Sequence, residues 1–280
     1  MLEMHGKKVK MLVTDKKYYM EKALVQNCDF LIHRSKNNWD NVIIIDGDER
    51  AGKSTLGRQI GYYIAYVLKK PFSNKNIFFN IDDLIEFARS NESQLIVWDE
   101  SALGGMSEDR YNKIQQLLIK MLMVCGKYNH TYIFIIPKIR KLADYIAEDR
   151  SIALIRVYAL DNINRGYFHS YGKKKKNMIS YLERRKLSTN HIKRDFRGTF
   201  QSYEHIPSKE VIDIIEYDKK KDEAISLLSS QEQQQDKHKI NLIKLATYLK
   251  KQHKIPFTEM SESMGYKSNY LSILAKNIKI

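Results

Sequence analysis

The chain has 280 residues, and its 48 Lys and Arg against 33 Asp and Glu give a formal net charge of +15. No apolar run reaches the ~18 residues needed to cross a bilayer, and the N-terminus lacks the continuous apolar stretch of a secretory signal. The two cysteines, Cys28 and Cys125, argue against a disulfide framework or a cysteine metal cluster and read as small core residues. We therefore expect a soluble, cytoplasmic protein without membrane insertion. Its basic balance favours a polyanionic partner, nucleic acid before an anionic membrane surface.

The first segment, residues 7–37, predicts a strand and a helix. A run of β-branched residues follows, Val42 to Ile45, with no polar alternation. Such a run is typical of a strand buried on both faces of a parallel sheet.

This strand leads into Gly47-x-x-x-x-Gly52-Lys53-Ser54, which has the spacing of a phosphate-binding P-loop. Glycines let backbone N–H groups turn around an anion, the lysine reaches the terminal phosphates, and the hydroxyl after it holds Mg²⁺. Apolar residues at helical spacing predict a helix beginning at Lys53 or Ser54. A plain strand–turn–helix is the alternative. The predicted nucleotide-binding residues are Gly47, Asp48, Glu49, Arg50, Ala51, Gly52, Lys53, Ser54 and Thr55.

A second motif follows a strand candidate at residues 76–80. Here an apolar run, Leu95 to Trp98, ends in Asp99 and Glu100. An aspartate at the carboxyl end of such a strand can reach the Mg²⁺ shell, and an adjacent glutamate can polarise the attacking water. The alternative is an ordinary strand that ends in a solvated acidic turn.

The next segments continue an alternation of helices and strands. The pattern predicts a helix over 111–128, a strand over 131–137, a helix over 139–150 and a strand over 152–160.

These motifs resemble the class of P-loop ATPases that carry a catalytic glutamate beside the Walker B aspartate, which includes RecA-like, AAA+ and FtsK/HerA-type motors. Within it, the histidine, strand and proline around residues 130–137 resemble the FtsK/HerA and Zot-like group of phages and mobile elements. The resemblance implies an α/β parallel-sheet P-loop NTPase with strand order 5-1-4-3-2 and the Walker B strand next to the P-loop strand. It also implies ATP and Mg²⁺ as ligands, Lys53 and Glu100 as catalytic residues, and Ser54 and Asp99 as metal ligands.

The family pattern leaves the sensor and the arginine finger open. Family members usually place a polar sensor where this chain has Pro137 and Lys138, so either Lys138 does that work or the sensor lies elsewhere. Motors of this class need a cation on the developing γ-phosphate charge, in cis or from a neighbouring subunit of a nucleotide-linked homo-oligomeric ring. Arg50 is the first candidate because its loop touches phosphate. The alternatives are Arg110, Arg140 and Arg150.

Residues 165–197 are strongly basic, with 11 Lys or Arg against two acidic residues. We expect this extension to contact DNA phosphates, above all through Lys173, Lys174, Lys175 and Lys176.

The C-terminal segment begins after a polar, glutamine-rich stretch, residues 218–238, that suits a linker or a solvated helix. A helix from about residue 240 precedes two short helices, with Thr258 and Ser268 as expected caps and Gly265 at the turn between them. This is the rhythm of a bacterial helix-turn-helix, although a bundle for oligomerisation or partner docking has the same periodicity. The DNA-contacting residues predicted here are Lys267, Ser268, Asn269, Tyr270 and Ser272.

The sequence therefore predicts an ATPase domain (1–165), a basic extension (166–217), a linker (218–238) and a small all-α helix-turn-helix domain (239–280). The expected function is Mg²⁺-dependent ATP hydrolysis coupled to double-stranded DNA, in a translocation or packaging motor of a phage or mobile element. A replication or transposition ATPase that loads a viral or replication partner, and a nucleotide-dependent protein-docking switch, remain alternatives. A small-molecule kinase is disfavoured, since kinases avoid a water-activating carboxylate.

Overall fold

The computed structural model describes residues 9–13, 16–100, 108–161, 163–200 and 213–278. The chain divides into two compact units, Met1–Ala224 and Ile225–Ile280. In the described part of the chain, no helix combines the length and the apolar character needed to span a membrane.

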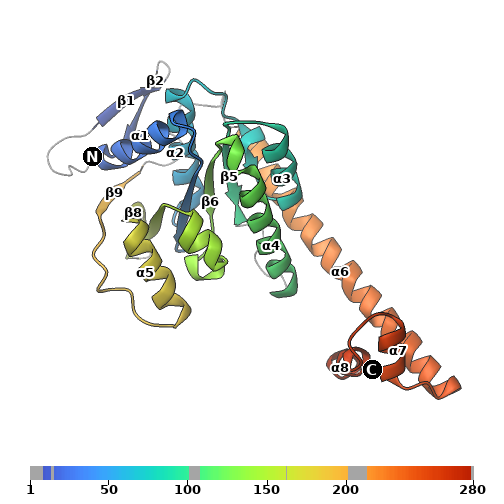
Figure 1. Ribbon diagram of the computed structural model, residues 1–280. Coiled ribbons are helices and arrows are strands. Elements are labelled where there is room, and N and C mark those ends of the chain that lie inside the picture. The colour runs from blue at the N-terminus through green and yellow to red at the C-terminus, as the bar shows by residue number, and fades with distance from the viewer. Residues whose placement is uncertain (1–8, 14–15, 101–107, 162, 201–212, 279–280) are drawn as a thin grey trace. The chain divides into compact units, whose positions relative to one another are not determined.

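Strands and helices alternate through the first unit, as Figure 1 shows. Its elements are β1 (Val9–Val13), β2 (Lys16–Met20), α1 (Lys22–Lys36), β3 (Asn41–Gly47), α2 (Lys53–Val67), η1 (Asn74–Asn76), β4 (Ile77–Phe78), α3 (Ile81–Ser90), β5 (Leu95–Asp99), α4 (Glu108–Val124), η3 (Cys125–Tyr128), β6 (Thr131–Ile135), η4 (Ile139–Lys141), the π-helix η5 (Tyr145–Arg150), β7 (Ala153–Leu160), β8 (Asn164–Gly172), α5 (Lys173–Arg184) and β9 (Phe196–Thr199). Helix α6 (Ile214–His253) begins in this unit and ends in the second, which also holds α7 (Phe257–Ser263) and α8 (Tyr270–Ile278).

The central sheet has seven strands in the order β4-β5-β6-β3-β7-β8-β9. Strands β3 to β7 pair in parallel, and counted from β3 as strand 1 they run 5-1-4-3-2. The whole sheet differs from the predicted five-strand order, because β8 and β9 extend it beyond β7 as antiparallel strands. The expectation that the Walker B strand neighbours the P-loop strand is wrong, because β6 lies between β5 and β3.

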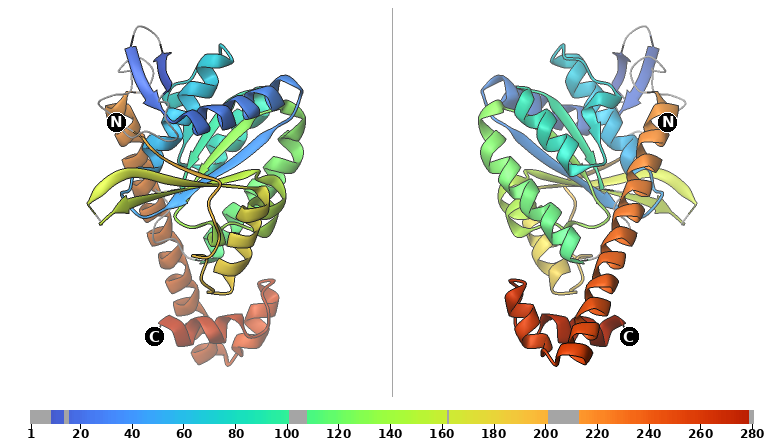
Figure 2. Two further views of the ribbon diagram at one scale, coloured as in Figure 1. Left: turned by 90° about the vertical axis from the view of Figure 1, so that its left-hand side faces the viewer. Right: turned by 90° about the vertical axis from the view of Figure 1, so that its right-hand side faces the viewer.

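Helices cover both faces of this sheet (Figure 2). Strand β3 is buried along its whole length, as its unbroken apolar run predicts. Ile43 and Ile45 point to one face, where they share a core with α1 and α2. Trp98 is fully buried at the end of β5, with its ring edge-to-face on Phe134 at 5.6 Å between centroids.

Three segments differ from the sequence prediction. The N-terminal segment forms a two-stranded sheet, β1 and β2, before its helix, where one strand was expected. Residues 139–150 form the short helices η4 and η5 instead of one α-helix. Of the predicted basic extension (166–217), residues 201–212 lie outside the described part of the chain. The rest includes two strands of the sheet, β8 and β9, and the helix α5.

The second unit is a small helical body. Ala246 of α6, Met260 of α7 and Leu271 of α8 form its core. The segment predicted as linker, 218–238, is helical within α6. Pro256 precedes α7, so Thr258 is not its cap, and α8 begins at Tyr270, two residues after the predicted cap Ser268.

His169 of β8 gives the protein a predictable pH dependence. It lies opposite Arg156 of β7 and Arg197 of β9. Burial first, and then Arg194, Arg197 and Arg156, lower the pKa of His169 to about 4. The unfolded chain binds a proton near the ordinary pKa of about 6.5, so the native state binds fewer protons between these values.

The contribution of His169 to the free energy of unfolding should therefore be fully present above about pH 6.5 and be lost as the pH is lowered toward about 4. When urea unfolding is measured at a series of pH values, the free energy of unfolding of His169→Gln should fall less steeply toward low pH than that of the wild type. The exposed His191→Gln variant is the control. An identical pH dependence in His169→Gln and the wild type would show that another group is responsible.

Candidate nucleotide site

The P-loop leaves β3 through a position that only glycine can occupy. Gly47 has φ +130°, and a Cβ atom there would lie 1.9 Å from the carbonyl oxygen of Val157. The amide of Asp48 donates to that same oxygen at 3.1 Å, which fixes the start of the loop against β7. Arg50 (φ +58°) and Gly52 (φ +104°) also adopt left-handed conformations, and α2 begins directly after Gly52. The predicted loop therefore closes into the helix N-terminus that can bind an anion.

Lys53 lies over this loop. Its ammonium donates to the carbonyl oxygens of Gly47 at 3.0 Å and Asp48 at 2.7 Å. Burial lowers the pKa of Lys53, and Asp46 and Asp99 oppose that shift. The lysine is thus held at the mouth of the loop, from which an incoming phosphate can take over its hydrogen bonds.

The predicted metal ligands lie side by side. The Ser54 hydroxyl donates to Oδ2 of Asp99 at 2.6 Å, joining the start of α2 to the end of β5. Asp99 is fully buried. Hard hydroxyl and carboxylate oxygens of this kind fit Mg²⁺, which takes further ligands from phosphate and water. No group of three or more His, Cys, Asp or Glu suited to a metal occurs among the described residues.

Glu100 comes directly after Asp99 and is also buried. Burial raises the pKa of Glu100 to about 7, and Asp99 adds to the rise against the opposing effects of Tyr111 and Lys141. A carboxylate tuned close to neutrality is the kind of group that serves as a general base.

A second buried carboxylate, which the sequence did not reveal as important, lies at the end of β3. Both oxygens of Asp46 accept from Arg156, at 2.8 and 2.6 Å, and Oδ2 also accepts from the backbone N–H of Ile139 at 3.0 Å. Arg156 also pairs with Glu183 of α5 at 2.8 Å. This cluster ties β3, β7, α5 and the segment after β6 together on the face of the sheet opposite α2.

Another residue of the site comes from far along the chain. Tyr217 of α6 is buried, and its hydroxyl donates to Oδ2 of Asp99 at 2.8 Å. No local sequence signal predicts this contact, because the two residues are 118 positions apart.

The candidate arginine fingers lie in different environments. Arg50 is exposed on the P-loop, and Arg140 is exposed in η4. Arg150 pairs with Asp40 and donates to the carbonyl of Leu122 at 3.3 Å, so it is engaged in the fold. The side chain of Arg110 lies outside the described residues.

The candidate sensor Lys138 lies near the P-loop. Its ammonium is 3.7 Å from Oδ1 of Asp48, and both side chains are well exposed. This places the cation beside the loop but leaves the sensor unassigned.

The four lysines at 173–176 begin α5 and differ in their exposure to solvent. Lys176 is fully buried, and its ammonium donates to the carbonyls of Ala147 and Glu148 and to Asn177. Burial and the neighbouring Lys173 lower the pKa of Lys176 to about 8. Lys176 is therefore removed from the predicted DNA contacts.

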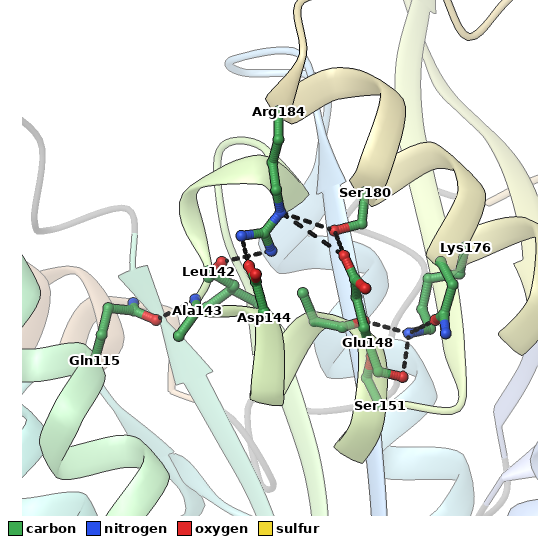
Figure 3. A network of polar contacts seen from close by, with 11 residues as sticks. Gln115, Leu142, Ala143, Asp144, Glu148, Ser151, Lys176, Ser180 and Arg184 are labelled. Atoms are coloured by element: carbon green, nitrogen blue, oxygen red, sulfur yellow. Dashed lines mark hydrogen bonds and ion pairs between the residues drawn. The ribbon is translucent and has the colours of Figure 1, made fainter.

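The network around Lys176 joins α5 to η5 (Figure 3). The Ser180 hydroxyl donates to Glu148 at 2.9 Å, and Arg184 donates to the carbonyl of Leu142 at 2.9 Å and pairs with Asp144. Lys173 and Lys174 remain exposed, while Lys175 pairs with Asp195.

In the second unit, the residues predicted to read DNA lie at the turn into α8. Lys267, Ser268 and Asn269 are exposed just before the helix, instead of inside its first turn. Tyr270 is half-buried and stacks on Tyr266 at 4.3 Å between centroids. Ser272 is half-buried, and its hydroxyl donates to the carbonyl of Asn269 at 2.8 Å.

No protein-family model and no curated protein match the sequence. Among solved structures, the chain is similar to B204, the DNA-packaging ATPase from Sulfolobus Turreted Icosahedral Virus, with 15% sequence identity and a TM-score of 0.34 over 50% of this chain and 95% of that chain. It is also similar to the genome packaging NTPase B204 from Sulfolobus turreted icosahedral virus 2 in complex with ATP-gammaS, with 10% identity and a TM-score of 0.34 over 58% and 98% of the two chains. For the same NTPase in complex with AMPPCP, the sequence identity is 11% and the TM-score is 0.31, over 49% of this chain and 94% of that chain.

The buried cluster at Asp46 predicts a large stability effect. Arg156→Ala leaves the Asp46 carboxylate buried without its cation, so the free energy of unfolding should fall by about 3–5 kcal/mol. Urea unfolding measures this, with Arg165→Ala, an exposed arginine on β8, as the matched control. Equal and small losses in the two variants would contradict a structural role for the cluster.

Proposed function

We propose that the chain is a Mg²⁺-dependent ATPase that acts on double-stranded DNA, as a translocation or packaging motor of a phage or mobile element. The ATPase part of this proposal rests on the 2.6 Å hydrogen bond between Ser54 and Asp99. This bond forms beside the P-loop, which begins at Gly47 and carries Lys53. A plain turn would not need to bring these groups together.

Each residue of the site has a role in this proposal. The loop amides and Lys53 bind the phosphates of ATP, and Ser54 and Asp99 hold the metal. When bound, Mg²⁺ would neutralise charge on the phosphate oxygens during transfer. Glu100 orients the water and takes its proton, for which a pKa of about 7 is well placed.

The remaining cation on the γ-phosphate is Arg50 in cis or an arginine of a neighbouring subunit. Arg50 has the right position, because it is exposed on the loop that would wrap the phosphates. A trans arginine would make hydrolysis depend on assembly into a ring. A fixed turnover per chain at all protein concentrations favours Arg50.

The action on DNA rests on charge and on the second unit. The net charge of +15 favours a polyanionic partner. Ser261 links α7 to α8, because its hydroxyl accepts from the amide of Leu271 at 3.1 Å and donates to the carbonyl of Phe257 at 2.7 Å. This leaves Lys267 and Asn269 exposed at the entry to α8, where a recognition helix carries its base contacts. Loading of a replication partner, and docking of a protein through the helical unit, remain the alternatives.

The nucleotide half of the proposal is tested by two variants that should fail differently. Lys53→Ala should lose ATP binding, because the ammonium group that contacts the terminal phosphates is gone. Glu100→Gln should keep binding but lose at least ~10²-fold in turnover, because only the base is removed. The exposed Glu92→Gln is the matched control. Turnover is measured with and without double-stranded DNA, and an equal loss of affinity in Lys53→Ala and Glu100→Gln would exclude Glu100 as the base.

The DNA half predicts a division of labour. Asn269→Ala should cost about 1–3 kcal/mol on the preferred site only, the range for one good base contact. Neutralising Lys173 and Lys174 should instead flatten the salt dependence and leave the preferred sequence unchanged, because lysines there meet phosphates. The measurement is selection from a randomised duplex pool by the full chain at two salt concentrations. Asn241→Ala, exposed on α6, is the control, and an unchanged preference in Asn269→Ala would make the second unit a docking bundle.

A further inference from the structure

The first turns of α6 contribute a side chain to the candidate magnesium site. Tyr217 is 3% exposed, and its hydroxyl donates to the same Asp99 oxygen that accepts from Ser54, at 2.8 and 2.6 Å. A tyrosine hydroxyl facing a carboxylate oxygen is the donor of the pair, because the carboxylate has no proton to give. One carboxylate oxygen thus receives two donors from elements on different parts of the chain.

The ring of Tyr217 is held in place from two sides. The Arg58 guanidinium lies 4.2 Å from the ring centroid, and Phe79 packs edge-on at 5.2 Å. Arg58 belongs to α2, the same helix that begins with Lys53 and Ser54. The ring therefore bridges the P-loop helix and the segment after β4.

The backbone of this part of α6 is fixed as well. Asn74 donates to the carbonyl of Asp213 and to the carboxylate of Glu216, each at 2.8 Å. Lys220 in turn donates to the carbonyl of Asn74 at 3.1 Å. These contacts fix the first turns of α6 next to Asn74, and with them the position of the Tyr217 hydroxyl.

We propose that Tyr217 is a positioning residue that orients the Asp99 carboxylate for Mg²⁺, so that the start of α6 completes the ATP site. The inference rests on the proposed function. Its reason is chemical: a carboxylate that binds a metal is oriented by the donors behind it, and loss of such a donor typically costs 10–100-fold in metal affinity or activity. Ser54 supplies one donor from within the P-loop, and Tyr217 supplies the other from a helix that the motifs do not include.

The test is Tyr217→Phe, which keeps the ring against Arg58 and Phe79 and removes only the hydroxyl. The matched control is Tyr63→Phe, which removes a hydroxyl that donates to Asp29 at 2.5 Å, from another buried tyrosine of the same unit. In Tyr217→Phe, the Mg²⁺ concentration for half-maximal turnover should rise about 10-fold, and saturating Mg²⁺ should restore turnover. Tyr63→Phe should follow the wild-type curve.

A second readout does not depend on turnover. The affinity for a fluorescent ATP analogue is measured in EDTA and in Mg²⁺, and the gain on adding Mg²⁺ should shrink in Tyr217→Phe while the affinity in EDTA stays at the wild-type value. A purely structural role would instead lower the thermal unfolding temperature and both affinities together, which overturns the proposal.

The two readouts also separate this inference from the proposed function. If the wild-type chain binds nucleotide in a Mg²⁺-dependent way but does not hydrolyse it, the ATPase proposal fails and the binding comparison still decides the role of Tyr217. If the wild type hydrolyses ATP and Tyr217→Phe shows the wild-type Mg²⁺ curve and the wild-type gain in affinity, the positioning role alone is overturned.

Discussion

The turn out of β3 is possible because residue 47 has no side chain. Any Cβ there would lie 1.9 Å from the carbonyl oxygen of Val157, so β7 and the P-loop approach each other only at a glycine. The amide of Asp48 then reaches that oxygen, and the loop closes around the positions where Lys53 and Ser54 emerge. The hydrogen bond from Ser54 to Asp99 depends on this placement, and so do the contacts of Asp99 with more distant elements. A backbone approach between two central strands therefore sets the geometry of the whole candidate site.

The local parts of this arrangement could be predicted from the sequence, and the distant parts could not. The P-loop spacing and the apolar run before Asp99 are contiguous patterns, and the structure brings the two motifs into contact. The place of Tyr217 is different, because its partner is 118 positions away and no periodicity records it. The strands β8 and β9 were missed for a related reason. The Lys and Arg residues of 165–197 suggested a basic extension, but only Arg165 and Arg197 of them lie on β8 and β9. Backbone pairing of β8 to β7 and of β9 to β8 decides where these strands lie.

Charge counts proved a poor guide to what is available to a polyanion. Several basic side chains of the first unit are fully used inside the fold. Arg156 neutralises Asp46 and Glu183, Lys176 satisfies backbone carbonyls, and Arg184 pairs with Asp144. These contacts join α5 to the sheet and to η5. The cations that stay exposed, such as Lys174 and Arg197, are therefore fewer than the net charge suggests.

The chain has two tryptophans, and their surroundings are opposite. Trp98 is fully buried and immediately precedes Asp99, whereas Trp39 is 58% exposed. A soluble quencher such as iodide would reach the indole of Trp39 and leave that of Trp98 shielded. Replacing Trp39 by phenylalanine would thus leave Trp98 as the one tryptophan, next to Asp99 at the end of β5. Selective excitation of that tryptophan would report on the surroundings of the candidate site without an added label.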